Sequence, residues 1–376
     1  MKKVLATVLA LVMALSVTTM AWADDVAKIG NTGYATLKEA IEHVANGETI
    51  VLTANVNNGD GIVVASGKNF TLDFAGHTYT ITQNVVGSTG TESQCFQLLK
   101  DSTITMKDGT IVANCASAKM IIQNYCNLTL DNMILNATAG NNNVGYVVSN
   151  NCGNVFIKNG TTITAKTTGV AFDVYGGFQN YGDVSVTLEA GATVNGKVEV
   201  ARGSGNQNKN TLTVTGGTVN GDLAVTPSEK TEVAVTGGTF SSYVSNYTAD
   251  DTPVAFNEGT YYVGAGTIQN AAKNLSAGDQ LEIMKGTVIL TDVPVGVTVA
   301  NNGAGTVTVN GSGAITEGNP YTVPARYYYY NSTTTDTKTT DTKGSPKTFD
   351  AGIALYVSMA LTSAAGVAFV GKKRED

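Results

Sequence analysis

The chain has 376 residues and an unusual composition: 14% are charged, 42 are Gly, 6 are Pro, and the net charge is −7. An ordinary soluble domain has about 25% charged residues, and a helical bundle is rich in Ala, Glu, Lys and Leu. A disordered chain would have a lower hydrophobic content than the 42% found here. The 3 Arg argue against nucleic-acid binding, because neutralising phosphates takes clustered Lys and Arg. Abundant Thr, Val, Asn and Gly favour short strands joined by tight turns, in two or three domains.

The first 23 residues have the three parts of a secretory signal peptide. Lys2 and Lys3 form the charged start, residues 4–17 form an apolar run, and Ala21 and Ala23 form a small-x-small cleavage site. We therefore expect an exported protein that is cleaved after Ala23. The alternative is a buried N-terminal helix, which would not need these parts in this order.

A short helix is predicted near the start of the mature chain. Thr36 and Glu39 fit a capping box, in which the hydroxyl and the carboxylate satisfy each other's free amides. Gly47 is expected to end the helix, and residues 49–53 to form the first strand. Apolar residues lie at helical spacing on one face: Leu37, Ala40, Ile41 and Val44.

The body of the chain is repetitive. Short segments with apolar residues at alternate positions start at residues 70, 104, 128, 155, 186, 212 and 233, which are 21 to 34 residues apart. Most are followed by a turn and a second short strand, and several by a third. Three strands per repeat, with loops of varying length, predict an all-β fold, a right-handed parallel β-helix whose stacked repeats share one core. A β-sandwich is the alternative, but its tight hairpin turns are not seen.

The first strand of each repeat is expected to alternate between an inner and an outer side. The residues predicted to point inward are Leu72, Met106, Leu130, Ile157, Leu188, Val214 and Val235. In five repeats the next residue is charged, so a solvated row is expected on the outer side: Asp73, Lys107, Asp131, Lys158 and Glu189.

Residues 34–41 read Tyr-Ala-Thr-Leu-Lys-Glu-Ala-Ile and are followed by a Gly and an apolar strand. This stretch resembles the N-terminal segment of pectin-lyase-like β-helix proteins, and the architectural resemblance extends to about residue 245. It implies a β-helix domain over residues 24–249, with an N-terminal cap helix. The segment 267–283 repeats the helix, Gly and strand pattern of residues 36–52, so residues 250–325 are expected to form a small β-rich module.

Pectin-lyase-like proteins are often enzymes on acidic polysaccharides, with clustered Asp as a common catalytic feature, so the resemblance raises the question of catalysis. Within the coils lie one Arg, Arg202, and the candidate carboxylates Asp73, Asp131, Asp173 and Asp183. The lyases commonly also use Ca²⁺ and an Arg, whereas the hydrolases pair several Asp on adjacent coils. A general acid and base must reach the bond they cleave, and no Asp-Asp, His-Gly or Arg-x-Lys motif singles out such a pair. We expect no catalytic residues and no cofactor.

Metal binding has weak support in the sequence. His43 lies beside the helix face and His77 in a turn, and two His are too few for a His-based metal site or triad. Asn57, Asn58 and Asp60 form the one compact candidate for Ca²⁺. A plain turn is the preferred interpretation of this segment, so no metal site is predicted.

Four cysteines lie in the middle repeats: Cys95, Cys115, Cys126 and Cys152. Their spacing matches no zinc motif. Cys126 and Cys152 are expected on neighbouring coils, either as a disulfide of an exported protein or as small buried residues. Thiols are the favoured interpretation.

The C-terminal part is predicted to be a stalk and an anchor. Residues 326–349 are rich in Tyr and Thr and have no apolar periodicity, which is typical of a flexible spacer. Residues 351–371 carry no charge and are long enough to cross a bilayer as a helix. We expect a transmembrane helix within residues 350–376, stopped on the cytoplasmic side by basic residues: Lys372, Lys373 and Arg374.

Directly before this span stand Ser345, Pro346, Lys347 and Thr348. The order Pro-x-Thr, apolar span and basic tail resembles the LPxTG-like sorting signal of Gram-positive cell-wall-anchored surface proteins. In that family a sortase cysteine attacks the Thr carbonyl and the acyl group passes to a cell-wall amine, which implies cleavage after Thr348. Ser345 stands where Leu is commonest and Phe349 where Gly is usual, so a plain membrane anchor is the alternative.

The sequence therefore predicts a non-catalytic bacterial surface protein that is displayed on the cell wall or membrane and binds glycans or proteins as an adhesin does. Its expected partners are a sortase, the peptidoglycan or membrane, and a glycan or host-surface ligand. Two alternatives stay open: a polysaccharide lyase or glycoside hydrolase of the β-helix type, and a passive structural spacer.

Overall fold

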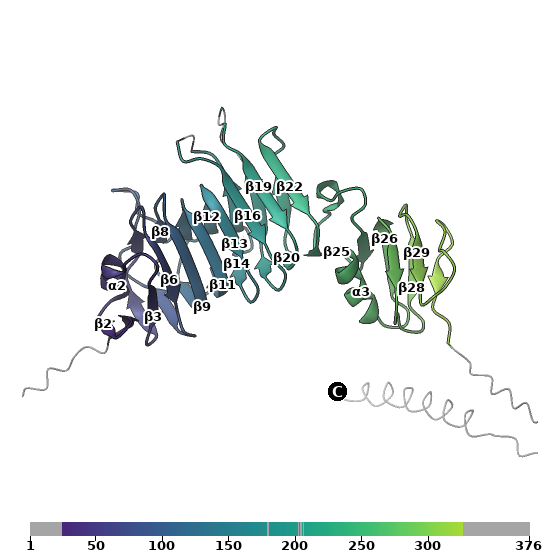
Figure 1. Ribbon diagram of the computed structural model, residues 1–376, viewed down its shortest axis with the longest axis horizontal. Helices are drawn as coiled ribbons and strands as arrows, with labels where there is room; N and C mark the ends of the chain where they lie inside the picture. The colour runs from purple at the N-terminus through teal and green to yellow at the C-terminus, as the bar shows by residue number, and fades with distance from the viewer. Residues whose placement is uncertain (1–24, 179, 202, 204, 206, 326–376) are drawn as a thin grey trace, which may run out of the picture. The chain divides into compact units, whose positions relative to one another are not determined.

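The computed structural model describes residues 25–178, 180–201, 203, 205 and 207–325. The chain divides into two units, 1–325 and 326–376, and all described residues belong to the first. The predicted signal peptide, stalk, sorting signal and transmembrane helix lie outside the described residues. Within the described ranges, no helix is long and apolar enough to cross a membrane. These residues are mostly β-strand, and most strands pair in parallel (Figure 1).

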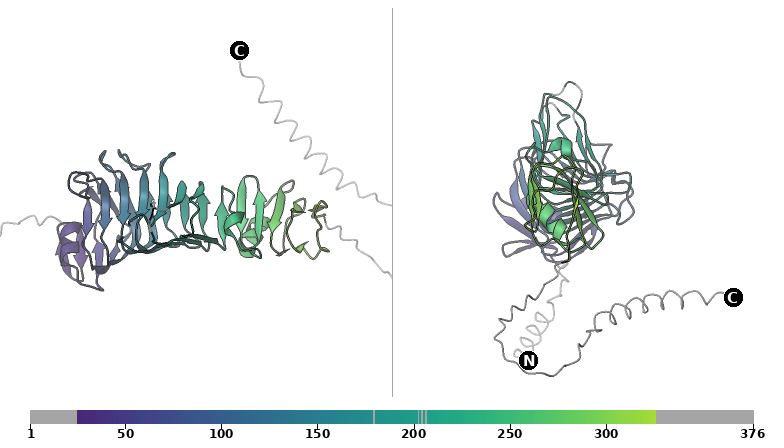
Figure 2. Two further views of the ribbon diagram at one scale, coloured as in Figure 1. Left: turned by 90° about the horizontal axis from the view of Figure 1, so that it is seen from above. Right: turned by 90° about the vertical axis from the view of Figure 1, so that its right-hand side faces the viewer.

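The strands between residues 49 and 240 form three files, in each of which one strand per repeat pairs in parallel with the strand of the next repeat. The first file is β3 (Thr49–Leu52), β6 (Asn69–Asp73), β9 (Thr103–Ala113), β11 (Asn127–Asn136), β13 (Gly153–Ile157), β16 (Val184–Leu188), β19 (Asn210–Val214) and β22 (Thr231–Val235). Figure 2 shows these strands side by side in chain order.

The second file begins with β4 (Val56–Gly59) and β7 (Thr78–Ile81), continues through the later halves of β9 and β11, and ends with β14 (Thr162–Thr164), β17 (Thr193–Asn195), β20 (Thr218–Asn220) and β23 (Gly238–Phe240). Strands β9 and β11 belong to both files because they turn the corner without a break. At these corners Asp108 and Asn132 have φ of 56° and 53°, a left-handed conformation that Asp and Asn tolerate better than most residues.

The third file is β5 (Ile62–Val64), β8 (Gln94–Leu98), β10 (Met120–Asn124), β12 (Tyr146–Asn150), β15 (Val170–Tyr175), β18 (Lys197–Ala201) and β21 (Leu223–Val225). Parallel strands need a connection longer than a hairpin turn. Here the other two strands of each repeat provide that connection, so the starts of consecutive strands in the first and third files are 20 to 34 residues apart.

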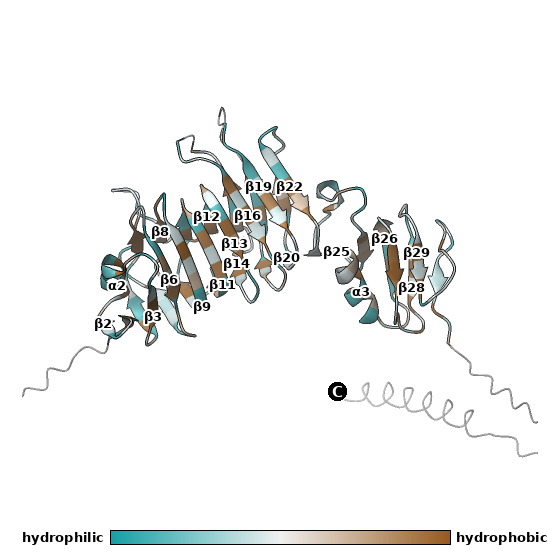
Figure 3. Ribbon diagram, viewed as in Figure 1, coloured by the Kyte–Doolittle hydropathy of each residue, from teal (hydrophilic) through white to brown (hydrophobic). Residues whose placement is uncertain are grey.

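The core lies between the three files. All seven residues predicted to point inward are buried, none more than 2% exposed, which confirms the alternation read from the sequence. Figure 3 shows this alternation of hydrophobic and hydrophilic residues along the strands of the first file. Large side chains complete the same hydrophobic cluster: Phe96 and Phe172 from the third file, and Phe74 from the turn directly after β6.

The N-terminal end is covered by a helix and two short strands, β1 (Ala27–Ile29) and β2 (Thr32–Tyr34). Strand β1 pairs antiparallel with β3, so it occupies the hydrogen-bonding edge that the first file would otherwise expose. The predicted cap helix is α2 (Leu37–His43), and Thr36 Oγ1 accepts a hydrogen bond from Glu39 N at 3.1 Å. Among the described hydrogen bonds, the Glu39 carboxylate makes none back to Thr36, so half of the capping box is formed.

The chain continues into a second β-rich part with its own hydrophobic cluster, which runs from Ala255 to Val323. Strand β25 pairs antiparallel with both β23 and β24, and β26 pairs antiparallel with β24. The predicted repeat of helix and strand is confirmed, since α3 precedes β26 as α2 precedes β3. The elements are β24 (Val254–Asn257), β25 (Thr260–Val263), α3 (Ala265–Lys273), β26 (Gln280–Lys285), β27 (Val288–Leu290), β28 (Thr298–Asn301), β29 (Val307–Val309) and β30 (Tyr321–Thr322), and a 3-10 turn, η1 (Ser245–Tyr247), precedes them.

Candidate functional site

The predicted row of charges lies along the first file, and its signs alternate. Asp73 and Asp131 are both in register with Lys107, which stands between them. Lys107 Nζ lies 2.8 Å from Asp73 Oδ2 and 3.0 Å from Asp108 Oδ2, and these hydrogen bonds raise the pKa of Lys107 to about 12. Asp73 and Asp131 are therefore not paired carboxylates, and the row has the partly exposed character of a solvated sheet face, with Asp73 and Lys107 ion-paired.

The other candidates considered from the sequence have local structural roles. Asp60 Oδ1 accepts a hydrogen bond from Asn84 Nδ2 at 3.0 Å, and its backbone oxygen accepts one from Tyr79. His43 Nδ1 lies 2.8 Å from the Glu39 carbonyl oxygen, at the end of α2. Over the described ranges, no group of three or more His, Cys, Asp or Glu side chains is arranged to hold a metal ion.

The remaining candidates from the sequence are Asp183 and Arg202, and the structure describes the first of them. Asp183 is exposed and its Oδ1 accepts a hydrogen bond from Lys209 N at 2.8 Å. Arg202 lies outside the described residues. Among the described contacts, none joins Asp183 to the carboxylates of the first file.

The four cysteines are free thiols. Burial raises the pKa of Cys95 and of Cys126 to about 12, so both stay protonated at neutral pH. Cys126 and Cys152 occupy equivalent turns on neighbouring repeats, because Asn124 and Asn150 just before them are in register. Cys126 Sγ donates to Asn124 Oδ1 at 3.2 Å, which holds it within a buried network of asparagine side chains.

Two carboxylates do come together on the third file. Asp173 of β15 is in direct register with Glu199 of β18, so they lie on the same side of adjacent strands, about 4.8 Å apart at the backbone. They continue a column of polar residues from earlier repeats, which are Gln97, Gln123 and Ser149.

Asp173 is almost completely buried, with 6% of its surface exposed. Its Oδ1 accepts a hydrogen bond from Asn150 N at 2.5 Å, and its Oδ2 accepts one from Ser149 Oγ at 3.1 Å. Burial raises the pKa of Asp173 to about 7; the two hydrogen bonds lower it, and the neighbouring Glu199 raises it. The carboxyl therefore gains and loses its proton near neutral pH.

Glu199 is more accessible, with 24% of its side chain exposed. Its Oε1 forms an ion pair with Lys197, two residues before it on β18. Its Oε2 accepts a hydrogen bond from the Tyr146 hydroxyl at 3.3 Å. The pair thus combines a buried carboxyl, whose pKa is raised, with a more accessible carboxylate that is ion-paired to Lys197 and lines a cavity.

Aromatic rings stand beside this pair. The rings of Tyr175 and Phe178 have centroids 5.9 Å apart and meet edge to face, and Phe178 continues to Tyr181 at 5.7 Å. Tyr181 in turn lies 4.8 Å from Tyr125. Phe178 and Tyr181 are 40% and 37% exposed, although large apolar rings gain most from burial.

A cavity of about 290 Å³ joins the carboxylates to the rings, and we call it the acidic groove. Its main lining residues are Gln123, Tyr146, Asp173, Tyr175, Phe178 and Glu199. Its volume lies at the lower end of the range for ligand sites, which are concave and combine aromatic surface with a few polar groups. This arrangement can stack a flat ligand face on a ring while the carboxylates accept hydrogen bonds.

Asp173 was among the candidate carboxylates predicted from the sequence, but Glu199 was not. The signal was present, because the segments VVSN, AFDV and KVEV align as successive strands of the third file and place Ser149, Asp173 and Glu199 in one column. The loops before these strands vary in length, which hid the register.

Comparisons with known protein families, curated proteins and solved structures find no match to this chain.

Proposed function

We propose that residues 24–249 form a right-handed parallel β-helix of the pectin-lyase-like kind. The support is the parallel register of three files, each with one strand per repeat, around one buried cluster. The right-handed sense follows from the strong preference of parallel crossover connections for that hand. Residues 250–325 extend the stack as the small module, through the pairing of β25 with β23.

On this proposal the chain is a non-catalytic surface protein of a bacterium. The signal peptide, stalk, sorting signal and apolar C-terminal span of the sequence support export and attachment, either to peptidoglycan by a sortase or to the membrane. The long outer faces of the repeats are then the display surface of the attached protein.

The function proposed for this surface is glycan binding in the acidic groove. The observation that carries the proposal is the Asp173–Glu199 pair beside exposed aromatic rings. Sugars present hydroxyl groups, which carboxylates bind as acceptors, and apolar C–H faces, which stack on rings. Buried polar groups of fixed orientation supply the selectivity of such sites.

Binding is favoured over catalysis because contacts with the protein hold both carboxyl groups in fixed orientations, while each oxygen keeps a further lone pair that can accept a hydrogen bond from a sugar. Each oxygen of Asp173 accepts a hydrogen bond from the protein, and each oxygen of Glu199 has a partner in Lys197 or Tyr146. A general acid or base must instead reach the bond that breaks. Held in this way, the pair is better suited to orienting a ligand than to transferring a proton.

The test is to measure binding of the purified chain to an array of defined oligosaccharides and to follow positive sugars by calorimetry. Phe178→Ala and Glu199→Gln should each weaken binding about tenfold, because each removes one ring contact or one charged acceptor. Tyr243→Ala and Glu232→Gln are matched controls, since both residues are exposed and do not line the groove. Unchanged affinity in both Phe178→Ala and Glu199→Gln would contradict the proposal.

Glycoside hydrolysis is the second candidate, and one observation favours it. A carboxyl with a pKa raised to about 7 beside a second, ion-paired carboxylate is the combination that a general acid and its partner require. If the chain is a hydrolase, it should release reducing sugar from one of the bound polysaccharides, and Asp173→Asn should abolish that release. Binding without release would exclude this candidate and keep the first.

A further inference from the structure

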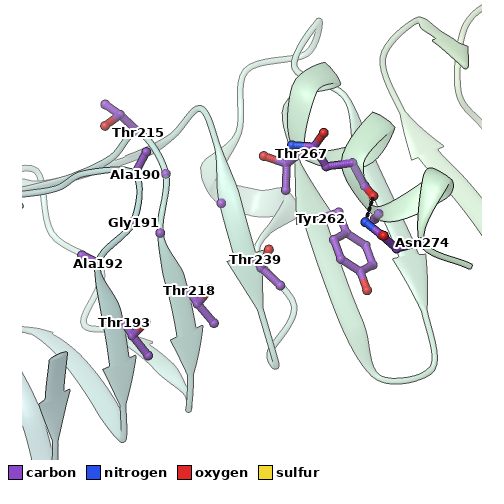
Figure 4. A pocket seen from close by; sticks show the side chains of 15 residues that line it. Ala190, Gly191, Ala192, Thr193, Thr215, Thr218, Thr239, Tyr262, Thr267 and Asn274 are labelled. Atoms are coloured by element: carbon purple, nitrogen blue, oxygen red, sulfur yellow. Dashed lines mark hydrogen bonds between the residues drawn. The ribbon is translucent and has the colours of Figure 1, made fainter. Parts of the chain in front are cut away.

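A second cavity, of about 430 Å³, lies at the other side of the repeats, and we call it the corner cleft (Figure 4). It forms where the first file turns into the second in the last three repeats. One wall consists of the turns before β17, β20 and β23, and the opposite wall consists of β25 and α3. It shares no lining residue with the acidic groove.

The corners that line the cleft carry only Ala, Gly and Thr, so their side chains are small. In earlier repeats the same corners carry larger residues, such as Phe74, Asp108 and Asn132. In the last ones they carry glycine pairs, including Gly217 and Gly238. Gly217 has φ of 84°, and a Cβ there would lie 2.8 Å from the Ala192 carbonyl oxygen, so a side chain is excluded by the backbone itself.

A file of threonines forms the floor of the cleft. Thr193, Thr218 and Thr239 are in direct register on β17, β20 and β23, and Tyr262 of β25 takes the next position. The four side chains therefore follow one another at steps of about 4.8 Å. Within the part of the chain that the structure describes, the three threonine hydroxyls make no hydrogen bond to protein, so they are free to bind a ligand.

Helix α3 supplies the amides of the opposite wall. Thr267, Asn270 and Asn274 line the cleft, and Asn274 Nδ2 is used locally, donating to the Asn270 carbonyl oxygen at 2.7 Å. Figure 4 shows Tyr262 between this helix and Thr239. The lining contains no Asp, Glu, Lys, Arg or His, so it offers a charged ligand no counter-charge.

We propose that the corner cleft binds an uncharged oligosaccharide, whose chain runs along the threonine file and stacks one sugar on Tyr262. Hydroxyl groups that both donate and accept match the threonine hydroxyls and asparagine amides. The ring of Tyr262 matches an apolar sugar face. The cavity is within the size range of small-ligand sites. This proposal does not depend on the acidic groove, because a different surface and a different ligand charge are involved.

The experiment titrates the full chain by calorimetry with the neutral tetrasaccharides of glucose, xylose, mannose and galactose. One of them should bind, and Thr218→Val, which keeps the side-chain volume, should weaken it about fivefold. Tyr262→Ala should weaken it about tenfold, whereas Tyr262→Phe keeps the ring and should retain most of the affinity. Thr187→Val is the matched control, because it removes a hydroxyl from an outward position of the first file.

Raising the salt concentration should leave this affinity unchanged, since no charged side chain lines the cleft. Glu199→Gln should also leave it unchanged, which separates the corner cleft from the acidic groove. The proposal is overturned if no neutral sugar binds, if a bound sugar is insensitive to Thr218→Val and Tyr262→Ala, or if binding is lost in Glu199→Gln alone.

Discussion

Asp173 shows how its surroundings set the chemistry of a single carboxyl group. Its neighbours along the column are neutral except for Glu199. The two hydrogen bonds that Asp173 accepts lower its pKa by less than the loss of hydration raises it. The sequence identified Asp173 as one of four scattered aspartates. It could not predict the raised pKa, because that value depends on burial and on a partner 26 residues away.

The stability of the protein should depend on pH through this residue. Between its usual pKa of 3.8 and the folded value of about 7, Asp173 keeps a proton that the unfolded chain releases. Its contribution to the free energy of unfolding therefore falls as pH rises through that window, by about 4 kcal/mol, and is constant on either side. Urea unfolding at pH 4 to 8 should show this loss, and Asp173→Asn should remove it. The exposed Asp183→Asn serves as control; a slope shared by all three proteins would contradict the assignment.

At the scale of strands, the alternation of apolar and polar residues was sufficient to predict most of the fold. It located the first strand of each repeat, the inward residues from Leu72 to Val235, and the second short strand that follows in most repeats. The helix α3 was predicted from its likeness to α2. The third file was recognised as strands, but its register was not, because the loops before it differ in length. The acidic groove depends on that register and was missed for the same reason.

Core and surface positions of one strand should respond differently to truncation. Leu130→Ala in β11 removes a side chain with no exposed surface, and should lower the free energy of unfolding by about 2 to 5 kcal/mol. Its neighbour Thr129 points outward in the same strand, so Thr129→Ala should change it by about 0.5 kcal/mol or less. Chemical denaturation of both variants measures the contrast, and equal losses would mean that the strand does not alternate as described.

At the scale of the whole molecule, export and attachment are predictions from the two ends of the sequence. If a sortase processes the chain, Thr348→Ala should move the protein from the covalently bound wall fraction to the membrane fraction. Thr342→Ala, in the stalk nearby, should leave it in the wall. Immunoblots of the two fractions read out the result, and an unchanged distribution of Thr348→Ala would leave the membrane anchor as the mode of attachment.

The alternating charges of the first file affect which repeats of the chain can pair with one another. The inward residues Leu72, Met106 and Leu130 are similar enough that the core alone would tolerate a repeat pairing with its second neighbour instead of its first. Such a skipped pairing would place Asp73 beside Asp131, and like charges on facing positions oppose pairing. Correct pairing instead places each of them beside Lys107. The alternating charges therefore favour the pairing of consecutive repeats over a pairing that skips one repeat.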